Sequence, residues 1–596
     1  MKLRTRKYTV LDCIGISLRC SPVIFPLRTL LTLGKAFIPA VSVTLTAQFV
    51  DAAIAAAQGE AAFELIFEPL LLLLLTIAYS LFQPKLLTLL RTLFQNDLRL
   101  RFRTALLDRR ARLDYKCIEN SDDWDVMRRL NTPNEYKSPE AAMATYASAL
   151  VLLISAAVTI ISVTTLIAAQ VWWVALLICV ALVPLVLLSM KSGEKNYDAF
   201  ADVSNEYRKT TYLNEVLTFR ETAAERTVFG YTDAVREDYR QQSNHMLDKE
   251  FKAHKAAFAS MNMNSIVVGA VSAACMGLLL IPALSGAISF GMFIGLFNAL
   301  ATVISLMRWT LINNIRIAAE CNKYMQDLTR YVHMPSDDST SAAPDRDIAP
   351  FESLEFRDVR FTYPTGEHPV LNGLSFTMRR GGHYAFVGAN GAGKTTITKL
   401  VTGLYREYEG QILLNGVELR EYTPAQLKAY FACVFQDFAR YHISFKENIA
   451  LGDERADEAA VLEAAHSAGL DELIEKNGLD AHIGKLEENG VDVSGGEWQR
   501  IAMARCIISP AQVKILDEPT AALDPIAESE VYENFRTISS GHTTVLISHR
   551  LGSTKLADTI FVLDGGKVVE SGSFDELMAL NGLYATMFES QRSWYI

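Results

Sequence analysis

Long apolar stretches dominate the first part of this chain and limit what it can fold into. The first ~330 residues contain six apolar stretches, each near the roughly 20 residues that an α-helix needs to cross a bilayer. They lie near residues 23–50, 65–90, 142–169, 171–192, 258–283 and 288–314. We therefore expect a six-helix transmembrane domain over residues 21–333.

The connections between these stretches differ in charge. The three short connections, at 51–64, 168–170 and 282–289, contain no Lys or Arg. The two long connections, at about 91–141 and 193–257, are rich in charge and show helical periodicity. Because basic residues concentrate on the cytoplasmic side of a membrane, we expect both long connections and both termini inside. The pattern predicts helices that extend into the cytoplasm from a multi-pass protein of the plasma or inner membrane.

Residues 1–20 begin with a basic head that contains Lys2, Arg4, Arg6 and Lys7. No long apolar core or clean small-residue cleavage site follows, which disfavours a cleaved signal peptide. We interpret the segment as an amphipathic elbow on the cytoplasmic membrane face, where its cations would meet anionic lipid. A disordered basic tail is the alternative. The net charge of −10 and the lack of a later basic arm argue against nucleic-acid binding.

The composition changes after the last apolar stretch. Residues 334–350 are polar and rich in Pro, Ser and Asp, which predicts a linker. Beyond them, short β-branched runs alternate with helical stretches and Gly turns. This pattern predicts an α/β domain over residues 351–596, with a mostly parallel sheet and an antiparallel β subdomain.

A glycine-rich run in this second half has the spacing of a phosphate-binding loop. The sequence GANGAGKTT follows the strand-like HYAFV and precedes a helical stretch, which is the strand–GxxxxGK[ST]–helix context of a P-loop. Glycines let successive N–H groups point inward, and the helix N-terminus adds positive charge, so the loop suits nucleotide phosphates. The residues expected to bind ATP here are Gly388, Ala389, Asn390, Gly391, Ala392, Gly393, Lys394, Thr395 and Thr396.

A second motif, VKILDEPTAALD at 513–524, supplies carboxylates. An apolar run ends in Asp517, which a buried strand would deliver to the sheet edge where Mg²⁺ binds together with the Thr395 hydroxyl. Glu518 follows directly. It is placed to act as general base for the water that attacks the γ-phosphate.

With further motifs in a fixed order, the region from about 354 to 589 resembles the ATPase domain of the ABC superfamily. The resemblance implies that Tyr363 stacks on adenine and that Gln436 senses Mg²⁺ and the attacking water. It also implies that Asp524 belongs to the D-loop and that His549 contacts the γ-phosphate. Glu488 sits where exporters carry an acidic residue that meets the loops of the membrane domain.

Ser494, Gly495 and Gly496 match the family's signature, with Val493 in place of Leu and Glu497 in place of Gln. In the family this motif caps an ATP bound to the other subunit, so the resemblance implies dimerisation. The partner is a second half-transporter, either the same chain or a homologous one. The acid at position 497 is a departure without an obvious phosphate role, and pairing with a nearby Arg is an alternative.

The membrane half resembles exporter membrane domains by architecture. By position, the loop tips at 115–127 and 219–231 match the helices that rest on ATPase domains. Lys35 lies midway along the first predicted crossing, where it would either line a substrate cavity or pair with another helix. We expect ATP-driven export of an amphipathic, drug-like, lipid or peptide substrate across the bilayer. The alternatives are import through the same fold and a non-transport, ATP-gated or regulatory role.

Overall fold

A computed structural model describes most of the chain. The described residues are 2–60, 62–132, 138–176, 179–180, 206–207, 209–219, 222–484, 489–518, 542–548 and 550–592. The chain divides into two compact units. Unit 1 comprises Met1–Arg109 and Asp125–His333, and unit 2 comprises Arg110–Trp124 and Met334–Ile596.

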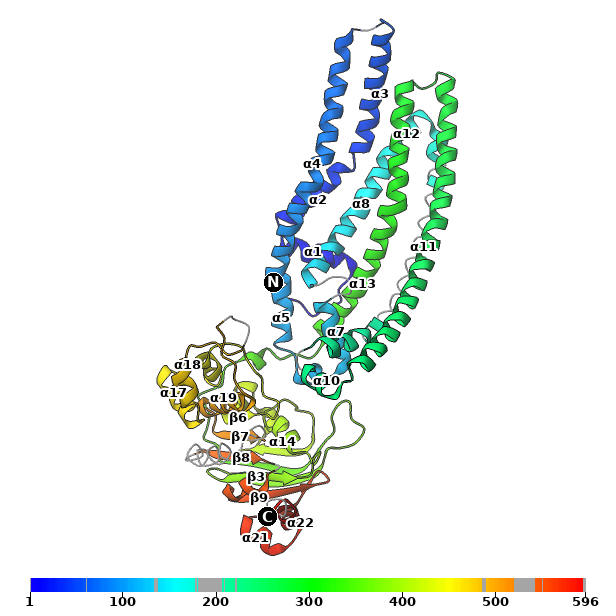
Figure 1. The fold of residues 1–596 in the computed structure, drawn as a ribbon. Helices are drawn as coiled ribbons and strands as arrows, with labels where there is room; N and C mark the ends of the chain where they lie inside the picture. Colours follow the sequence, from blue (N-terminus) through cyan, green and yellow to red (C-terminus); the bar gives the residue numbers. More distant parts are fainter. Residues whose placement is uncertain are drawn as a thin grey trace. The chain divides into compact units, whose positions relative to one another are not determined.

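Unit 1 is helical (Figure 1). Its described elements are α1 (Val10–Cys20), α2 (Ile24–Lys35), α3 (Ile38–Ala57), η1 (Phe63–Ile66), α4 (Phe67–Leu98), η2 (Arg99–Arg103), α5 (Thr104–Arg110), α7 (Ser121–Asn131), α8 (Pro139–Gln170), α10 (Ala223–Phe229), α11 (Thr232–Leu284), α12 (Phe290–Ser305), η3 (Leu306–Leu311) and α13 (Ile312–His333). The last residue of α5 and the first four of α7 belong to unit 2.

Three helices in the described part of the chain are long and apolar enough to cross a membrane, namely Ile24–Ala57, Phe63–Arg110 and Pro139–Gln170. The apolar stretches Ala273–Leu284 and Phe290–Ser305 are shorter and lie where the fifth and sixth crossings were predicted. The fourth predicted crossing, 171–192, falls mostly outside the described residues. A total of six crossings therefore stays a prediction, whereas the helical class of the domain is confirmed.

The first predicted crossing is interrupted. Helix α2 ends at Lys35 and α3 begins at Ile38, with Pro39 in its first turn. Proline lacks an N–H group and is tolerated mainly in the first turn of a helix, so Pro39 favours a new start here. The exposed Lys35 thus lies at a helix end, and it has no ion-pair partner within the described residues.

Close backbone contact joins α3 and α12. Gly291 and Gly295 form a GxxxG pattern in α12, and a Cβ atom at Gly295 would lie 2.6 Å from the carbonyl oxygen of Val43. Small residues at this spacing let two membrane helices approach closely. Asp51 of α3 accepts a hydrogen bond from the N–H of Gly291 at 2.9 Å and so caps α12.

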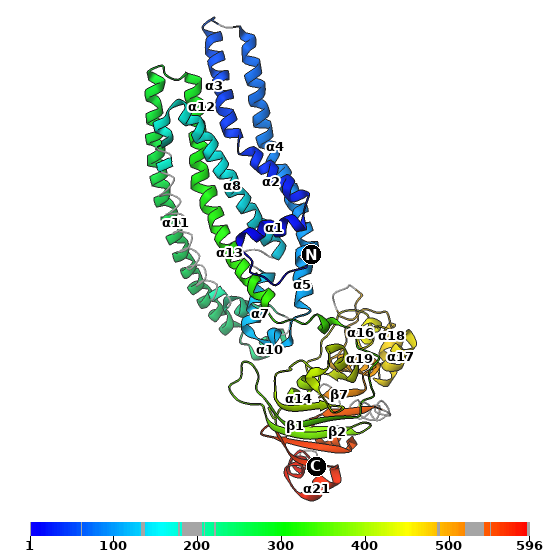
Figure 2. The same ribbon diagram turned by 180° about the vertical axis from the view of Figure 1, so that it is seen from behind.

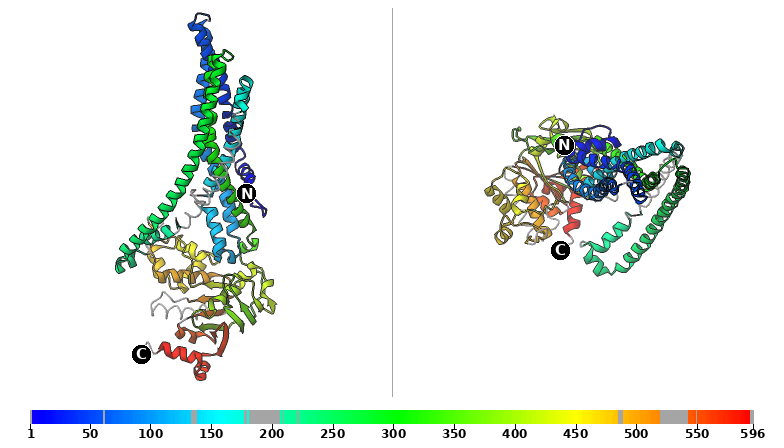
Figure 3. Two further views of the ribbon diagram at one scale, coloured as in Figure 1. Left: turned by 90° about the vertical axis from the view of Figure 1, so that its right-hand side faces the viewer. Right: turned by 90° about the horizontal axis from the view of Figure 1, so that it is seen from above.

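The predicted loop helices are present where the chain is described. Helix α4 continues through η2 into α5, and α11 runs without a break for 53 residues (Figure 3). The charged residues of the long connections therefore lie on extensions of the apolar helices. The first part of the connection at about 193–257 is described and helical at 206–207 and 209–218.

Unit 2 contains two sheets (Figure 2). The larger sheet has the order β10-β9-β3-β8-β7-β6, and the smaller antiparallel sheet has the order β2-β1-β4-β5. The strands are β1 (Ser353–Phe361), β2 (Leu371–Arg379), β3 (His383–Gly388), β4 (Glu409–Leu414), β5 (Val417–Glu418), β6 (Phe431–Val434), β7 (Val513–Asp517), β8 (Thr543–Ile547), β9 (Thr559–Asp564) and β10 (Lys567–Gly572).

The described helices of unit 2 are α6 (Tyr115–Glu119), η4 (Asp338–Ser341), α14 (Lys394–Val401), η5 (Leu419–Glu421), α15 (Pro424–Tyr430), α16 (Phe445–Ala450), α17 (Glu458–Ser467), α18 (Asp471–Asn477), α19 (Gly495–Ile508), η6 (Leu551–Leu556), α21 (Phe574–Leu580) and α22 (Leu583–Arg592). Strands β3, β8, β7, β6 and β9 are parallel, and β10 is antiparallel. The predicted class, a mostly parallel sheet with an antiparallel β subdomain, is confirmed. Parallel strands present their carboxyl ends at one sheet edge, which is where ligands bind in such folds.

Candidate nucleotide-binding site

The phosphate-binding loop joins β3 to α14. Gly388 ends the strand, and Gly391 and Gly393 have φ angles of +82° and +100°, which L side chains rarely adopt. A Cβ atom at Gly393 would lie 2.5 Å from Leu371 Cδ2, whereas one at Gly391 would meet nothing within 4 Å. The loop is therefore packed on one side and open on the other. Ala389, Asn390 and Gly391 are exposed, and Ala392 is buried.

Lys394 begins α14 and is almost completely buried at 6% exposure. Its Nζ donates hydrogen bonds to the carbonyl oxygens of Gly388 at 2.8 Å and Ala389 at 3.1 Å. Burial lowers the pKa of Lys394, and the carboxylates of Glu518 and Asp517 oppose that shift. The ammonium group is thus held inside the loop, close to both acids of the second motif.

Asp517 ends β7, one strand removed from β3 across β8. It is 1% exposed, and within the described residues neither carboxylate oxygen has a hydrogen-bond partner. Burial raises the pKa of Asp517 to about 6, although the nearby Thr395 hydroxyl lowers it. Two buried oxygens without donors are costly unless a cation or donor satisfies them. The Asp517 carboxylate and the neighbouring Thr395 hydroxyl are oxygen donors of the kind that Mg²⁺ prefers.

The described residues hold no cluster of three or more His, Cys, Asp or Glu side chains that could bind a metal ion. Such a cluster is not required for Mg²⁺, which commonly uses one or two protein ligands together with substrate phosphates. Gln436 is exposed just beyond β6, whose Val434 is paired with Leu516 of β7. The amide is therefore at the same sheet edge as Asp517.

Glu518 has a left-handed backbone conformation, with φ at +53°. This conformation is costly for a residue with a side chain, and such strain clusters at functional sites. Two hydrogen bonds hold it: its N–H donates to the Ile547 carbonyl at 2.9 Å, and its carbonyl accepts from Gln499 Nε2 at 3.1 Å. Gln499 is buried in α19, so the helix after the signature positions the acid.

Tyr363 follows β1 and lies beside the loop. Its hydroxyl is 3.0 Å from Thr396 Oγ1, so the ring is fixed to α14. The ring packs edge-on against Tyr405 at 5.4 Å between centroids, and Lys399 Nζ lies 5.2 Å from its centroid. The ring is partly exposed and available for stacking.

The signature residues crown α19. Ser494 and Gly495 are exposed, and Gly496 is partly exposed. The Ser494 hydroxyl accepts a hydrogen bond from the Glu497 N–H at 3.3 Å, and the Glu497 carboxylate accepts one from the Ser494 N–H in return. This is a capping box, which satisfies two N–H groups of the helix end. The Glu497 carboxylate therefore caps its own helix. No arginine pairs with it among the described residues, and the suggested arginine pairing stays a prediction.

Three predicted residues cannot be placed. Asp524 and His549, expected in the D-loop and at the γ-phosphate, lie outside the described residues, as does Glu488. The other predicted site residues fall into two groups. One group follows the ends of β1, β3, β6 and β7, and the signature residues form the start of α19.

Comparison with known proteins decides the family. The profile of the family described as "ABC transporter" matches residues 371–521. An ATP-dependent lipid A-core flippase of Chromohalobacter salexigens is 30% identical over 423 residues, which are 70% of this chain and 72% of that protein. This chain belongs to the ABC transporter family.

Two further likenesses extend over most of this ABC transporter. The subtilin transport ATP-binding protein SpaT of Bacillus subtilis is 28% identical over 507 residues, covering 84% of this chain and 81% of that protein. The solved structure of a bacterial Atm1-family ABC exporter with ATP bound covers 96% of this chain and 98% of that chain, with a TM-score of 0.74 and 23% identity. The membrane and ATPase parts are thus fused in one chain, which is an ATP-hydrolysing translocase.

The transporter's loop helix α6 adds contacts that the motifs did not reveal. Glu119 accepts hydrogen bonds from Lys399 Nζ at 2.8 Å and from the Tyr405 hydroxyl. The ring of Tyr115 packs edge-on against Tyr405, at 5.8 Å between centroids. Lys399 and Tyr405 are also the neighbours of Tyr363. A loop helix that connects membrane helices is therefore bonded to the residues beside the expected adenine position.

Only a weak sequence signal marks these contacts. Lys399 is the fifth residue after Lys394, and Glu119 lies in a charged loop tip that was expected to dock by position. Gln499 is the second residue after Glu497 of the signature but resembles any polar residue of an amphipathic helix. The pairings join residues 280 and 19 positions apart, which no local pattern encodes.

Proposed function

We propose that this ABC transporter exports an amphipathic, drug-like, lipid or peptide substrate, driven by ATP hydrolysis and by alternating access of the membrane domain. In this proposal, residues 1–20 are the elbow, 21–333 the membrane domain, 334–350 the linker and 351–596 the ATPase domain. Its relatives are named for subtilin transport and for flipping lipid A-core, which supports an amphipathic cargo. Both termini face the cytoplasm, in keeping with the basic residues of the long connections.

In this proposal the P-loop holds ATP. The backbone N–H groups of residues 388–393 and the Lys394 ammonium contact the phosphates, and Tyr363 stacks on adenine. Thr395, Gln436 and Asp517 would hold Mg²⁺, which supplies positive charge next to the β- and γ-phosphates when it is bound. The unpartnered, buried oxygens of Asp517 support this assignment.

Glu518 is the proposed general base. It accepts a proton from the water that attacks the γ-phosphorus, while the bond to the β-phosphate oxygen breaks and ADP leaves. Gln436 and His549 position the water and the γ-phosphate. The positive φ of Glu518 and its two backbone hydrogen bonds fix its position before ATP binds, which supports a catalytic role.

The exposed signature carries the proposal of a dimer. Ser494, Gly495 and Gly496 crown a helix N-terminus, and in the described residues no hydrogen bond joins them to residues 388–396. A helix N-terminus attracts anions, so a phosphate on a second subunit is its natural ligand. Asp524 belongs to the same interface. We propose that two ATP-filled P-loops each meet the signature of the partner, which is the same chain or a homologous one.

Reconstitution tests the function. The purified chain in proteoliposomes is given candidate amphipathic compounds, and ATP hydrolysis and the movement of labelled compound are measured together. We expect stimulated hydrolysis and movement away from the ATPase side. Lys394→Ala should abolish both, whereas the exposed Glu475→Gln in α18 should retain both. Movement toward the ATPase side would favour import. ATP hydrolysis that no compound stimulates, without movement of any compound, would contradict transport.

A further inference from the structure

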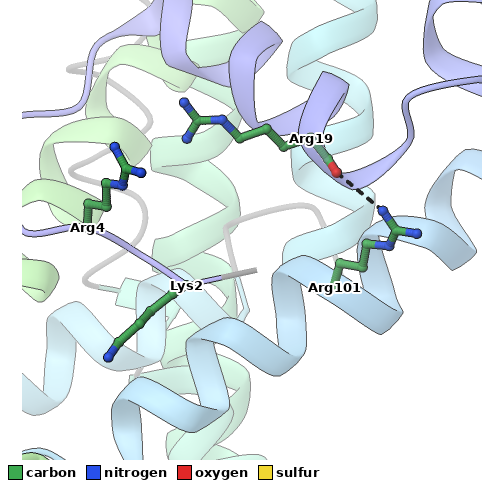
Figure 4. Close-up of a pocket in the computed structure, with 4 residues that line it drawn as sticks. All are labelled: Lys2, Arg4, Arg19 and Arg101. Carbon is green, nitrogen blue, oxygen red and sulfur yellow. Dashed lines mark hydrogen bonds between the residues drawn. The ribbon is translucent and has the colours of Figure 1, made fainter.

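Four cations of unit 1 line one cavity of about 560 Å³. Figure 4 shows that they come from three elements: Lys2 and Arg4 from the extended N-terminal segment, Arg19 from α1 and Arg101 from η2. Arg101 also donates a hydrogen bond to the carbonyl oxygen of Arg19, at 3.4 Å, which ties η2 to the end of α1.

The N-terminal segment is held against the helices. The Tyr8 N–H donates to Thr329 Oγ1 of α13 at 2.9 Å, and the Tyr8 hydroxyl accepts from the Arg4 N–H at 3.2 Å. Leu3 and Tyr8 are buried, at 7% and 5% exposure. Lys2 and Arg4 are therefore fixed in place next to the cavity, and the alternative of a loose basic tail does not describe this segment.

The arginines of the π-helical turn η2 have different partners. Arg99 and Arg103 both pair with the buried Glu140 of α8, at 3.0 and 3.4 Å. Phe102, which lies between Arg99 and Arg103 in the sequence, is fully buried. Arg101 instead reaches α1 and the cavity. A π-helical turn of this kind often marks a functional site in a helix.

The residues that line the cavity are all cations. In the described part of the chain, no carboxylate forms an ion pair with Arg4, Arg19 or Arg101. Asp12 of α1 pairs with Arg6, which does not line the cavity, and Asp97 of α4 accepts a hydrogen bond from the Ser21 hydroxyl at 2.6 Å. Clustered like charges repel unless an anion joins them. Guanidinium groups match the oxygens of phosphate particularly well.

Exposed apolar side chains on and just after α1, the helix that contributes Arg19, indicate where this anion comes from. Leu11 and Leu18 of α1 are 75% and 42% exposed, and Val23 is 73% exposed. A helix with exposed leucines and an arginine at its end is typical of a membrane interface, where lipid tails and head groups meet. We propose that this cavity binds the phosphate of an anionic phospholipid head group, one lipid to each chain. The proposal requires a membrane-embedded chain, and it does not depend on transport.

Native mass spectrometry tests this site. The full chain is purified from vesicles that contain about one-fifth phosphatidylglycerol in phosphatidylcholine, and the lipid retained by each chain is measured. The wild-type chain should retain phosphatidylglycerol, and Arg19→Gln with Arg101→Gln should reduce its retention about tenfold or more. Arg4→Gln, whose side chain makes no bond within the described residues, should reduce retention without affecting folding. Lys7→Gln, which is exposed in the same segment but does not line the cavity, should have little effect.

Three results would overturn the site. Equal loss of lipid in the Lys7→Gln chain would show a general attraction between basic residues and the membrane. Retention unchanged in Arg4→Gln and in the double variant would show that the cavity holds no lipid. Displacement of phosphatidylglycerol by a millimolar excess of inorganic phosphate would show that soluble phosphate is the ligand.

Discussion

The Glu119 carboxylate of the loop helix α6 accepts a hydrogen bond of 2.8 Å from the Lys399 ammonium of α14, the helix that begins with the P-loop lysine. The Tyr405 hydroxyl donates a hydrogen bond to the same carboxylate, and the Tyr405 ring packs against the ring of Tyr363. The covalent connection from α5 to α7 thus passes through a helix bonded to the expected adenine site. We infer that nucleotide binding is transmitted to the membrane helices through Glu119.

Glu119→Ala should lower the amount of substrate transported per ATP hydrolysed by about fivefold. The physical reason is the loss of one partly exposed ion pair and one hydrogen bond, together worth about 1–2 kcal/mol. Lys399 is 16% exposed and Glu119 is 39% exposed, so solvent weakens the pair. The measurement is the ratio of transport to hydrolysis in proteoliposomes.

A charge exchange provides the control. If the pair itself carries the coupling, Glu119→Lys combined with Lys399→Glu should restore part of the ratio that each single variant loses. Single variants whose ratio equals that of the wild type would contradict the inferred route.

Glu497→Gln should preserve the capping box at α19, because an amide oxygen can still accept from the Ser494 N–H. It also removes a negative charge beside the phosphate that we propose the signature to bind, so ATP-dependent dimerisation should be as strong or stronger. Glu497→Ala should destabilise the ATPase unit by about 0.5–1 kcal/mol. Thermal unfolding and ATP-dependent sedimentation measure the two effects.

Glu576 offers a matched comparison, since it forms the same capping box with Ser573 at α21. Glu576→Gln should leave dimerisation as it is. If Glu497→Gln weakened dimerisation while Glu576→Gln did not, the carboxylate would have a positive role in the signature that capping does not explain.

Gly295→Leu should separate α3 from α12. The added side chain would meet the Val43 backbone at a distance that no Cβ atom tolerates, and overpacking of this kind typically costs about 1–3 kcal/mol. The expected result is a lower melting temperature of the detergent-solubilised chain. Gly277→Leu on α11 is the control, because a Cβ atom there meets nothing within 4 Å. Equal destabilisation by both variants would show that the close approach is not the cause.

Tyr363→Phe keeps the ring and loses only the hydrogen bond to Thr396, so the KM for ATP should change by about twofold or less. Tyr363→Ala removes the stacking surface, and the KM should rise by about tenfold. Steady-state ATPase assays distinguish the two variants. A KM unaffected by Tyr363→Ala would exclude adenine stacking at this residue.

Local motifs in the sequence predicted the parts of the site that depend on spacing alone. Residues 388–396 form a loop and a helix start because their glycines and lysine are neighbours along the chain. The burial of Asp517 at a strand end was predicted for the same reason. The break between Lys35 and Ile38 was missed, because hydropathy over a long window does not register one proline at a helix start.

The family resemblance led us to expect that the loop tip at 115–127 docks on an ATPase domain, but its individual contacts could not be predicted. Glu119 and Lys399 are 280 positions apart, and their contact depends on how residues 110–124 pack within unit 2. The cap formed by Glu497 was missed for another reason. The signature was compared with a family pattern, and the S-x-x-E spacing of an ordinary capping box was overlooked.

The ATP trapped by Glu518→Gln tests the central claim most directly, namely that two chains enclose ATP and that Glu518 releases it by hydrolysis. In nanodiscs with ATP and Mg²⁺, the variant should retain about one ATP per chain as a stable dimer. Its hydrolysis rate should be about 100-fold or more below that of the wild type, with Glu475→Gln as the active control. A Glu518→Gln chain that hydrolyses ATP at the wild-type rate, or that retains ATP as a monomer, would contradict the account.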